Sequence, residues 1–319
     1  MESKAFMWSH LIHLGSNMWN EEGNTKGREH RSTPCASPVF LFDRDAWDSY
    51  TLKLSEAGVN TLVIDIGEAM RYESHPEIAV KGAWSHEQMQ SEIDRLRGLG
   101  FELVPKLNFS ACHDVWLGEY SRMLSTKPYY TACGDIIDEV CKLFKPRYFH
   151  LGMDEETFGH QKNFQYAVVR NGDLWWHDLY FFIDHVERNG ARPWVWSDYI
   201  WNHPDIFVQK MPREVLQSNW YYSGCFHEEE EGFSESHARY LSGFELLERH
   251  GYDQVPTGSV WSNENNFERL TEYCAERISP EHFLGMMQTV WERVDPAWMN
   301  KHNTAIEHIR IARSLLESN

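Results

Sequence analysis

Residues 147–155 read RYFHLGMDE, and this stretch decides the fold. Its first seven residues form an apolar run of strand length, which the helix breaker Pro146 separates from a helical stretch at residues 134–143. Two acidic residues, Asp154 and Glu155, follow the run directly. A helix, a breaker and a buried strand in this order predict one unit of an alternating α/β protein.

The same alternation extends from this unit toward both ends of the chain. Eight runs of strand length occur, at residues 6–14, 60–66, 101–109, 147–153, 192–199, 214–220, 255–261 and 283–291. Stretches with helical periodicity lie between or after them, from residue 45 and at residues 87–99, 134–143, 174–188, 236–250 and 303–316. Glycines follow several of these stretches, as is typical of helix ends.

Strands that alternate with helices must pair in parallel, because each crossover needs a helix. Eight such units in 319 residues fit a closed barrel better than a doubly wound sheet. A doubly wound dinucleotide-binding fold would carry G-x-G-x-x-G after its first strand, and the chain has no such motif there. No Pro/Ser-rich linker interrupts the pattern. The sequence therefore predicts one (β/α)8 barrel, an α/β fold, over residues 1–319.

Composition excludes several classes of partner. The formal net charge is −18, and no stripe of lysine and arginine is present, which argues against nucleic-acid binding. The first residues lack an apolar signal core, and no stretch approaches the roughly 20 apolar residues that span a bilayer. Six scattered cysteines without CxxC spacing indicate reduced thiols. We expect a cytoplasmic protein that binds no membrane and needs no cofactor or metal; its oligomeric state stays open.

In a barrel of this kind the active site lies at the carboxyl ends of the strands. Carboxylates, amides and indoles gather at the predicted strand ends, and these groups suit a carbohydrate, whose hydroxyls need hydrogen-bond partners and whose ring stacks on tryptophan. The chain has fourteen tryptophans. The sharpest feature is the pair Asp154 and Glu155, because two adjacent carboxylates raise the pKa of one of them and can hold different roles.

The segment His150-Leu151-Gly152-Met153-Asp154-Glu155 resembles the His-x-Gly-Gly-Asp-Glu motif of glycoside hydrolase family 20, the β-N-acetylhexosaminidases, with Met153 in place of the second glycine. In that family the motif also closes the fourth strand of a (β/α)8 barrel. Weaker similarities cover most of the barrel, at residues 104–108 (VPKLN), 194–198 (WVWSD), 217–221 (QSNWY) and 289–292 (TVWE).

The resemblance implies an exo-acting β-N-acetylhexosaminidase with substrate-assisted retaining catalysis, acting on a terminal amino sugar. Glu155 would protonate the leaving oxygen, and Asp154 would orient the substrate's 2-acetamido group, whose carbonyl oxygen attacks the anomeric carbon. Either Tyr221 or Tyr222 would donate to that oxygen. The predicted substrate-binding residues are His113, Asn108, His150, Trp196, Asp198, Trp220, Tyr221, Tyr222, Trp261, Trp291 and Glu292.

Departures from the family pattern leave the sugar open. The arginine that the family usually places after the first strand is absent from residues 10–15. Lys106 and Asn108 stand where acidic residues are usual, and the small α/β domain that commonly precedes the barrel is not found.

Three alternatives to this function stay open. Glu292 could face Glu155 as the second carboxylate of an ordinary retaining glycosidase, with the carboxyls about 5–5.5 Å apart.

The second alternative is a carbohydrate-binding barrel without turnover. The third is a divalent metal site built from His10, His13 and Asp65. Because an offset of three residues puts the two histidines on opposite faces of a strand, we do not expect this metal site.

Overall fold

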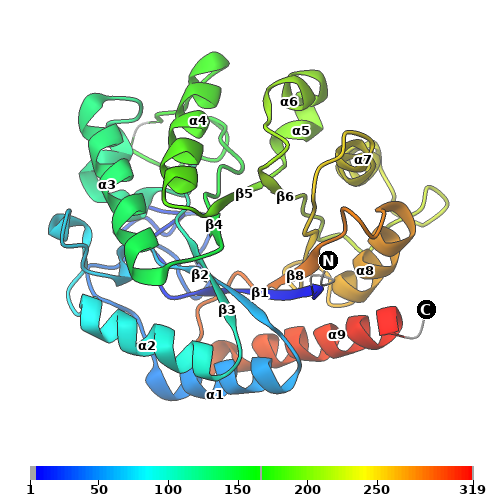
Figure 1. The fold of residues 1–319 in the computed structure, drawn as a ribbon, viewed down its shortest axis with the longest axis horizontal. Helices are drawn as coiled ribbons and strands as arrows, with labels where there is room; N and C mark the ends of the chain where they lie inside the picture. Colours follow the sequence, from blue (N-terminus) through cyan, green and yellow to red (C-terminus); the bar gives the residue numbers. More distant parts are fainter. Residues whose placement is uncertain (1–4, 166, 318–319) are drawn as a thin grey trace.

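The computed structural model describes residues 5–165 and 167–317 and confirms the (β/α)8 barrel (Figure 1). All strand pairs are parallel, in the order β6-β5-β4-β3-β2-β1-β8-β7. Single bridges join the two end strands of this order and so close the ring. One runs from Gln217 in β6 to Gln254 before β7, and the other from Trp220 after β6 to Thr257 in β7. The strands are β1 (Met7–His13), β2 (Thr61–Asp65), β3 (Glu102–Lys106), β4 (Tyr148–His150), β5 (Arg192–Trp196), β6 (Leu216–Ser218), β7 (Thr257–Ser259) and β8 (Gly285–Thr289).

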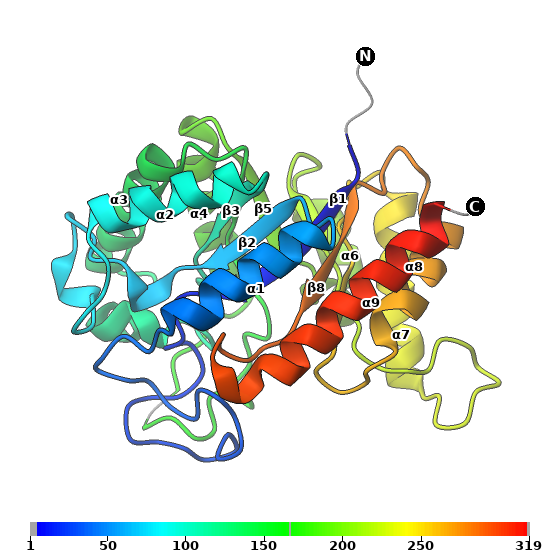
Figure 2. The ribbon, with the colours of Figure 1, turned by 90° about the horizontal axis from the view of Figure 1, so that it is seen from below.

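Helices surround the barrel, and α1 and α9 lie side by side along its outside (Figure 2). The helices are α1 (Arg44–Glu56), α2 (His86–Gly98), α3 (Lys127–Phe144), α4 (Asp173–Arg188), α5 (Tyr199–Asn202), α6 (Pro204–Lys210), α7 (Glu235–Arg249), α8 (Asn266–Arg277) and α9 (Met299–Glu317), with short 3-10 turns at Gly67–Ala69, Pro76–Ile78, Val115–Arg122 and Pro296–Trp298.

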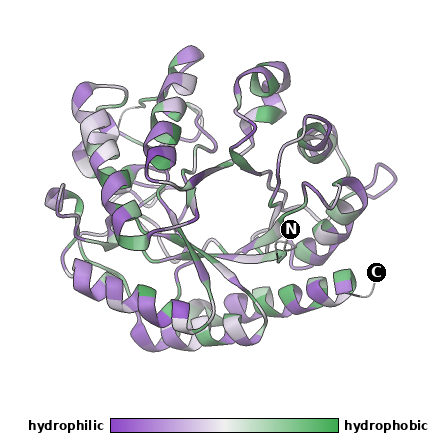
Figure 3. Cartoon of the chain, in the orientation of Figure 1, coloured by the Kyte–Doolittle hydropathy of each residue, from purple (hydrophilic) through white to green (hydrophobic). Residues whose placement is uncertain are grey.

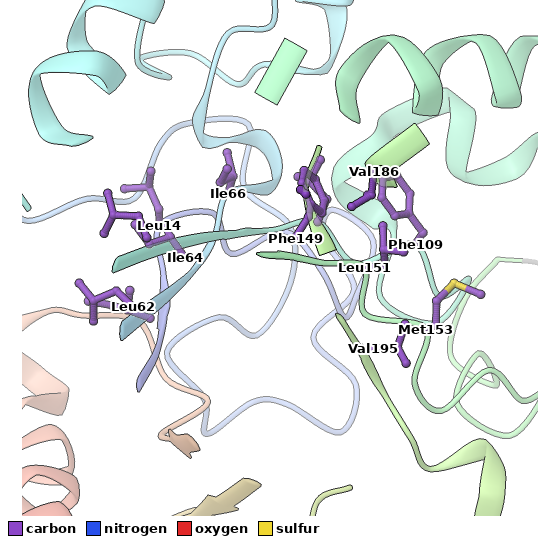
Figure 4. Packing of buried hydrophobic residues seen from close by; sticks show 14 of the residues in the cluster. Leu14, Leu62, Ile64, Ile66, Phe109, Phe149, Leu151, Met153, Val186 and Val195 are labelled. Atoms are coloured by element: carbon purple, nitrogen blue, oxygen red, sulfur yellow. The ribbon is translucent and has the colours of Figure 1, made fainter. Parts of the chain in front are cut away.

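The core has two layers because side chains alternate along each strand. In β2, Leu62 and Ile64 point outward into the layer between the strands and the helices, part of which Figure 4 shows. Val63 points inward and packs in the barrel interior with Val104 and Trp194. The barrel is therefore filled with side chains, and a ligand can enter only at its ends.

Local signals in the sequence set the ends of the helices. The Asp43 side chain accepts from the backbone N–H of Ala46 and caps α1, and Ser85 forms a capping box with Gln88 at the start of α2. Each surrounding helix carries hydrophilic as well as hydrophobic residues (Figure 3), and its buried residues are mainly apolar, as the periodicity predicts.

The strands are shorter than predicted, mostly at their carboxyl ends. The fourth run, predicted over residues 147–153, is a strand only over Tyr148–His150. The third, predicted over residues 101–109, ends at Lys106. In both cases the remaining apolar residues are buried but leave the sheet to form the loops of the candidate site. No helical stretch was named between the last two strand runs, where the structure has α8 with Phe267, Leu270 and Cys274 buried.

No helix in the described ranges is long and apolar enough to cross a membrane. All six cysteines lie among the described residues and are free thiols, four of them buried.

Candidate active site

The backbone after β4 adopts an uncommon conformation that places Asp154 and Glu155. Gly152, Met153 and Glu155 all have positive φ, at 71°, 77° and 55°. A Cβ on Gly152 would lie 2.0 Å from Asn108 Oδ1, so only glycine fits beside the end of β3. Met153 holds a position where the family motif has glycine. Its side chain is buried in the outer core, and this burial offsets the cost of the left-handed backbone.

Replacing Gly152 with alanine is expected to displace Asn108 and lower the free energy of unfolding by about 1–3 kcal/mol. Thermal denaturation measures the effect. Gly98→Ala, in the last turn of α2 with open space around its Cβ position, is the matched control and should be neutral or slightly stabilising. Equal melting temperatures for the two variants would contradict this account of the loop.

Asp154 is held by two side chains from the loop after β3. Asn108 Nδ2 donates to Asp154 Oδ1 at 2.8 Å, while Asn108 Oδ1 accepts from the backbone N–H of Met153 at 3.2 Å. His113 Nε2 lies 3.3 Å from Asp154 Oδ2 and 3.3 Å from Glu155 Oε2. One imidazole nitrogen thus lies within ion-pair distance of both carboxylates.

The charges around Asp154 keep it ionised. Burial opposes ionisation, but His113, Lys106 and the amide of Asn108 together hold the pKa of Asp154 below its usual range. Burial also opposes the charged form of His113 and would lower its pKa, but the carboxylates of Asp154 and Glu155 raise this pKa to about 10. At neutral pH the site therefore contains an ionised Asp154 beside a protonated His113.

A third carboxyl group, Asp198 at the start of α5, behaves in the opposite way. Its Oδ2 accepts from the backbone N–H of Glu155 at 2.9 Å, and its Oδ1 is buried with no hydrogen-bond partner in the described structure. Burial and the charge of Asp154 raise the pKa of Asp198 to about 8. Asp198 is therefore protonated at neutral pH and positions Glu155 through its backbone.

This raised pKa predicts how stability depends on pH. Because the pKa of Asp198 is higher in the folded state than in the unfolded chain, its contribution to stability is full below about pH 4 and is lost as the pH rises to about 8. Asp198→Asn keeps the acceptor for the Glu155 N–H and removes the titration. Its free energy of unfolding relative to wild type should increase by about 2 kcal/mol or more from pH 4 to pH 8. Urea titrations at the two pH values measure this, and a constant difference would contradict it.

The carboxylates open into a cavity of about 660 Å³ whose walls include five tryptophans and one tyrosine. Trp196 and Trp291 lie with their ring centroids 5.9 Å apart, and Trp220 stacks on Tyr222 at 5.0 Å. Of the predicted site residues, the structure brings eight together around this cavity: His113, Asp154, Glu155, Trp196, Trp220, Tyr222, Trp261 and Trp291.

The other predicted site residues lie outside the cavity wall. Asn108 hydrogen-bonds to the carboxylate of Asp154, and Asp198 accepts from the backbone N–H of Glu155. His150 is buried against Trp196, with ring centroids 4.5 Å apart. The Tyr221 hydroxyl donates to the carbonyl of Cys225, and Tyr221 lines a neighbouring cavity instead. Of the two candidate tyrosines, Tyr222 is therefore the one that faces the carboxylates' cavity.

Glu292 is buried and turned toward the loop that follows β1. Its carboxylate lies 3.0 Å from Arg31 Nη1 and 3.4 Å from Lys301 Nζ, and it accepts from the backbone N–H of Ser32 at 3.0 Å. These partners hold the pKa of Glu292 below its usual value in spite of its burial. Glu292 does not line the cavity, so it does not face Glu155 as a second carboxylate.

Two long loops supply cavity residues that the sequence did not reveal. Residues 14–43, after β1, contribute Trp19, Asn20, Lys26, Gly27 and Arg28; residues 151–172, after β4, contribute Gly159, His160, Lys162 and Asn163. His160 Nε2 lies 3.6 Å from Glu155 Oε1. The length of residues 14–43 without periodicity was the only signal, because loops longer than about 12–15 residues in compact domains are often functional.

The charged residues inside the barrel explain one departure from the family pattern. Lys106 Nζ donates to Asp65 Oδ2 at 2.6 Å, and both side chains are buried. His13 Nδ1 lies 3.4 Å from the same oxygen, whereas His10 Nε2 contacts the hydroxyl of Tyr50 on α1 at 2.7 Å. His10 and His13 thus point to opposite faces of β1, and the three residues His10, His13 and Asp65 do not form one metal-binding group.

Within residues 5–165 and 167–317, one group has ligand atoms close enough together to hold a metal ion. Atoms of His113, Asp154 and Glu155 lie within 4.8 Å of one another. The protonated imidazole of His113 already places a positive charge between the two carboxylates.

An acidic pair at the carboxyl end of a barrel strand, set in a cavity lined by indoles, is the kind of site that glycoside hydrolases carry. The profile of glycosyl hydrolase family 20, catalytic domain, matches residues 105–302, which is more than half of the chain. The chain belongs to this family.

Individual relatives are distant. The lacto-N-biosidase of Bifidobacterium bifidum is 20% identical over 229 residues, which cover 62% of this chain and 20% of that protein. Solved structures share the fold at low identity. The β-N-acetylhexosaminidase of Bacteroides fragilis has a TM-score of 0.58 at 14% identity, over 96% of this chain and 65% of that one. The chitobiase of Flavobacterium johnsoniae has a TM-score of 0.63 at 16% identity, over 89% of this chain and 49% of that one. The chain thus spans about a fifth of the curated relative.

Proposed function

We propose that the protein is an exo-acting β-N-acetylhexosaminidase that uses substrate-assisted retaining catalysis. The observation that carries the proposal is the pair Asp154 and Glu155, whose carboxylates lie side by side against one imidazole in an aromatic cavity. Among the described residues that line the cavity, these two are the carboxylates. A two-carboxylate glycosidase would place its second carboxylate across the sugar. The internal nucleophile of an acetamido sugar makes that residue unnecessary.

In the proposed reaction Glu155 donates its proton to the glycosidic oxygen as the bond from that oxygen to the anomeric carbon breaks. The carbonyl oxygen of the 2-acetamido group bonds to the anomeric carbon, giving a cyclic oxazolinium ion. Asp154, ionised at neutral pH, accepts from the acetamido N–H and stabilises the positive charge. Glu155 then takes a proton from a water molecule. The oxygen of that water attacks the anomeric carbon and opens the oxazolinium ring, so that the β-configuration is kept.

The surrounding residues support these roles. Tyr222 faces the cavity and would donate to the acetamido oxygen, and Trp196 and Trp291 would enclose the acetamido methyl group. The loops after β1 and β4 support exo action. Asn24 Nδ2 donates to the carbonyl of Asn163 at 2.5 Å, and this bond joins the two loops beside the cavity. A cavity bounded in this way suits one terminal sugar.

The two adjacent tyrosines provide a matched pair of variants. Tyr222→Phe should lower kcat/KM on an aryl 2-acetamido-2-deoxy-glycoside by roughly tenfold, the value of one hydrogen bond to a charged group. Tyr221→Phe removes the hydroxyl that bonds the Cys225 carbonyl, outside the carboxylates' cavity, and should lower thermal stability with little change in kcat/KM. Steady-state kinetics and thermal denaturation on both variants test the assignment, and a larger kinetic loss in Tyr221→Phe would overturn it.

A thiazoline inhibitor, which mimics the cyclic intermediate, tests the mechanism. We expect it to bind far more tightly than N-acetylhexosamine itself, because it resembles the state that the site stabilises. Calorimetry of both ligands on wild-type protein gives the comparison. Equal affinities would contradict substrate-assisted catalysis. Tight thiazoline binding without turnover of any aryl glycoside would indicate a carbohydrate-binding barrel that has lost catalysis.

A further inference from the structure

The cavity carries a charge opposite to that of the protein. The chain has a formal net charge of −18, yet the cavity is lined by Lys26, Arg28 and Lys162 against the carboxylates of Asp154 and Glu155. The two carboxylates already contact the imidazole of His113. Three cations thus lie in the cavity of an acidic protein without being needed to balance the catalytic pair.

The cations come from the two loops that bound one side of the cavity. Lys26 and Arg28 belong to the loop after β1, and Lys162 belongs to the loop after β4; Figure 2 shows both loops at the same end of the barrel. The carbonyl of Lys26 accepts from Asn163 Nδ2 at 3.2 Å. This bond from a side chain to a backbone carbonyl joins the two loops, and all three cations line the one cavity.

These cations have few partners of their own. The Lys26 and Lys162 side chains are exposed, and neither ammonium forms an ion pair or hydrogen bond with a described residue. Arg28 lies with its guanidinium 4.0 Å over the ring of Trp19, and its Nε donates to the carbonyl of Thr33 at 3.1 Å. Its Nη2 is buried without a hydrogen-bond partner in the described structure. A buried, unpaired guanidinium nitrogen in a ligand cavity is a donor that awaits an acceptor.

A neighbouring cavity is lined by acidic residues instead, so the positive charge is confined to the cavity that holds Asp154 and Glu155. It shares the walls Trp220, Tyr222 and Trp261 with the first cavity, and the charged residues that line it are Glu230 and Glu231. An anionic group would therefore bind on the side of the loops after β1 and β4, away from the acidic cavity.

From this juxtaposition we infer that the enzyme selects an amino sugar that bears an anionic substituent, held by Arg28, Lys26 and Lys162. The shared chemistry is an oxyanion: a sulfate ester, a phosphate ester or an ether-linked carboxylate on the sugar ring. Arg28 offers directed hydrogen bonds to such a group, and the two lysines add point charges. The inference rests on the proposed function for the identity of the sugar.

Direct binding tests the inference without requiring turnover. Calorimetry at low and high salt compares N-acetylglucosamine with its 6-sulfate, its 6-phosphate and its 3-O-lactyl ether on wild-type protein. We expect at least one anionic sugar to bind roughly tenfold more tightly than the neutral one at low salt, and the preference to shrink in 0.5 M salt. The sugar that binds best identifies the anion and its position.

Variants connect this preference to the loops. In the Lys26→Ala/Lys162→Ala double variant, and separately in Arg28→Gln, the ratio of anionic to neutral affinity should fall by roughly two- to fivefold or more. Lys142→Ala, which removes an exposed ammonium in the last turn of α3, is the matched control and should keep the wild-type ratio.

Each outcome decides the matter. Equal wild-type affinities for neutral and anionic sugars, or a preference that survives all of the variants, would overturn the inference. If the wild type cleaves neutral aryl N-acetylhexosaminides but shows no anionic preference, only this inference fails. If it prefers anionic sugars but cleaves no glycoside, only the proposed hydrolysis fails.

Discussion

Replacing Glu155 with glutamine is expected to lower kcat for an aryl 2-acetamido-2-deoxy-glycoside by roughly 10²–10⁴-fold, the usual value of general acid–base catalysis. The loss should depend on the leaving group. A phenol that leaves easily needs little protonation, so the variant should retain more activity on nitrophenyl than on methylphenyl glycosides. Glutamine preserves the size of the side chain, and thermal stability should change little.

Steady-state kinetics across a series of aryl leaving groups measures this dependence. Glu29→Gln, an exposed residue of the loop after β1 that does not line the cavity, is the matched control and should retain wild-type kinetics. A uniform loss for all leaving groups would mean that Glu155 does not donate the proton.

Replacing Asp154 with asparagine should lower kcat/KM by roughly 10²–10³-fold, because the charge that stabilises the oxazolinium ion is lost. Asparagine can still accept from Asn108 Nδ2, so the loop should stay in place. His113 also loses one of the two carboxylates that raise its pKa, and this pKa should fall from about 10.

The loss in Asp154→Asn should extend to ligands that mimic the cyclic oxazolinium ion. Binding of a thiazoline inhibitor, measured by calorimetry, should weaken in parallel with kcat/KM, because both depend on the same negative charge. Unchanged thiazoline affinity together with reduced turnover would assign Asp154 a structural role. NMR titration of the His113 ring gives an independent readout of the lost carboxylate.

The fold, and the position of Asp154 and Glu155 together at the end of the fourth strand, could be predicted because their signals are local. The run at residues 147–153 is apolar and is followed directly by the acids, so the strand and its position in a barrel follow from periodicity. The strand ends were predicted too long because Gly152 and Met153 leave the sheet with positive φ, and an apolar pattern cannot distinguish a buried loop from a strand.

The remainder of the site depends on contacts between distant parts of the chain. The predicted place of Glu292 at the strand end does not reveal that Arg31, 261 residues away, binds its carboxylate. Lys26 and Lys162 lie in loops without periodicity, and their proximity follows from bonds between Asn163 and the loop after β1. No pattern in the sequence connects these segments.

The rates at which the wild-type protein cleaves aryl β-N-acetylglucosaminide, aryl β-N-acetylgalactosaminide and aryl β-glucoside test the central claim most directly. Substrate-assisted catalysis requires the acetamido group, so one or both N-acetyl substrates should be cleaved and the glucoside should not. Cleavage of the glucoside alone would contradict the assignment of Asp154 and Glu155 and would require a separate nucleophile.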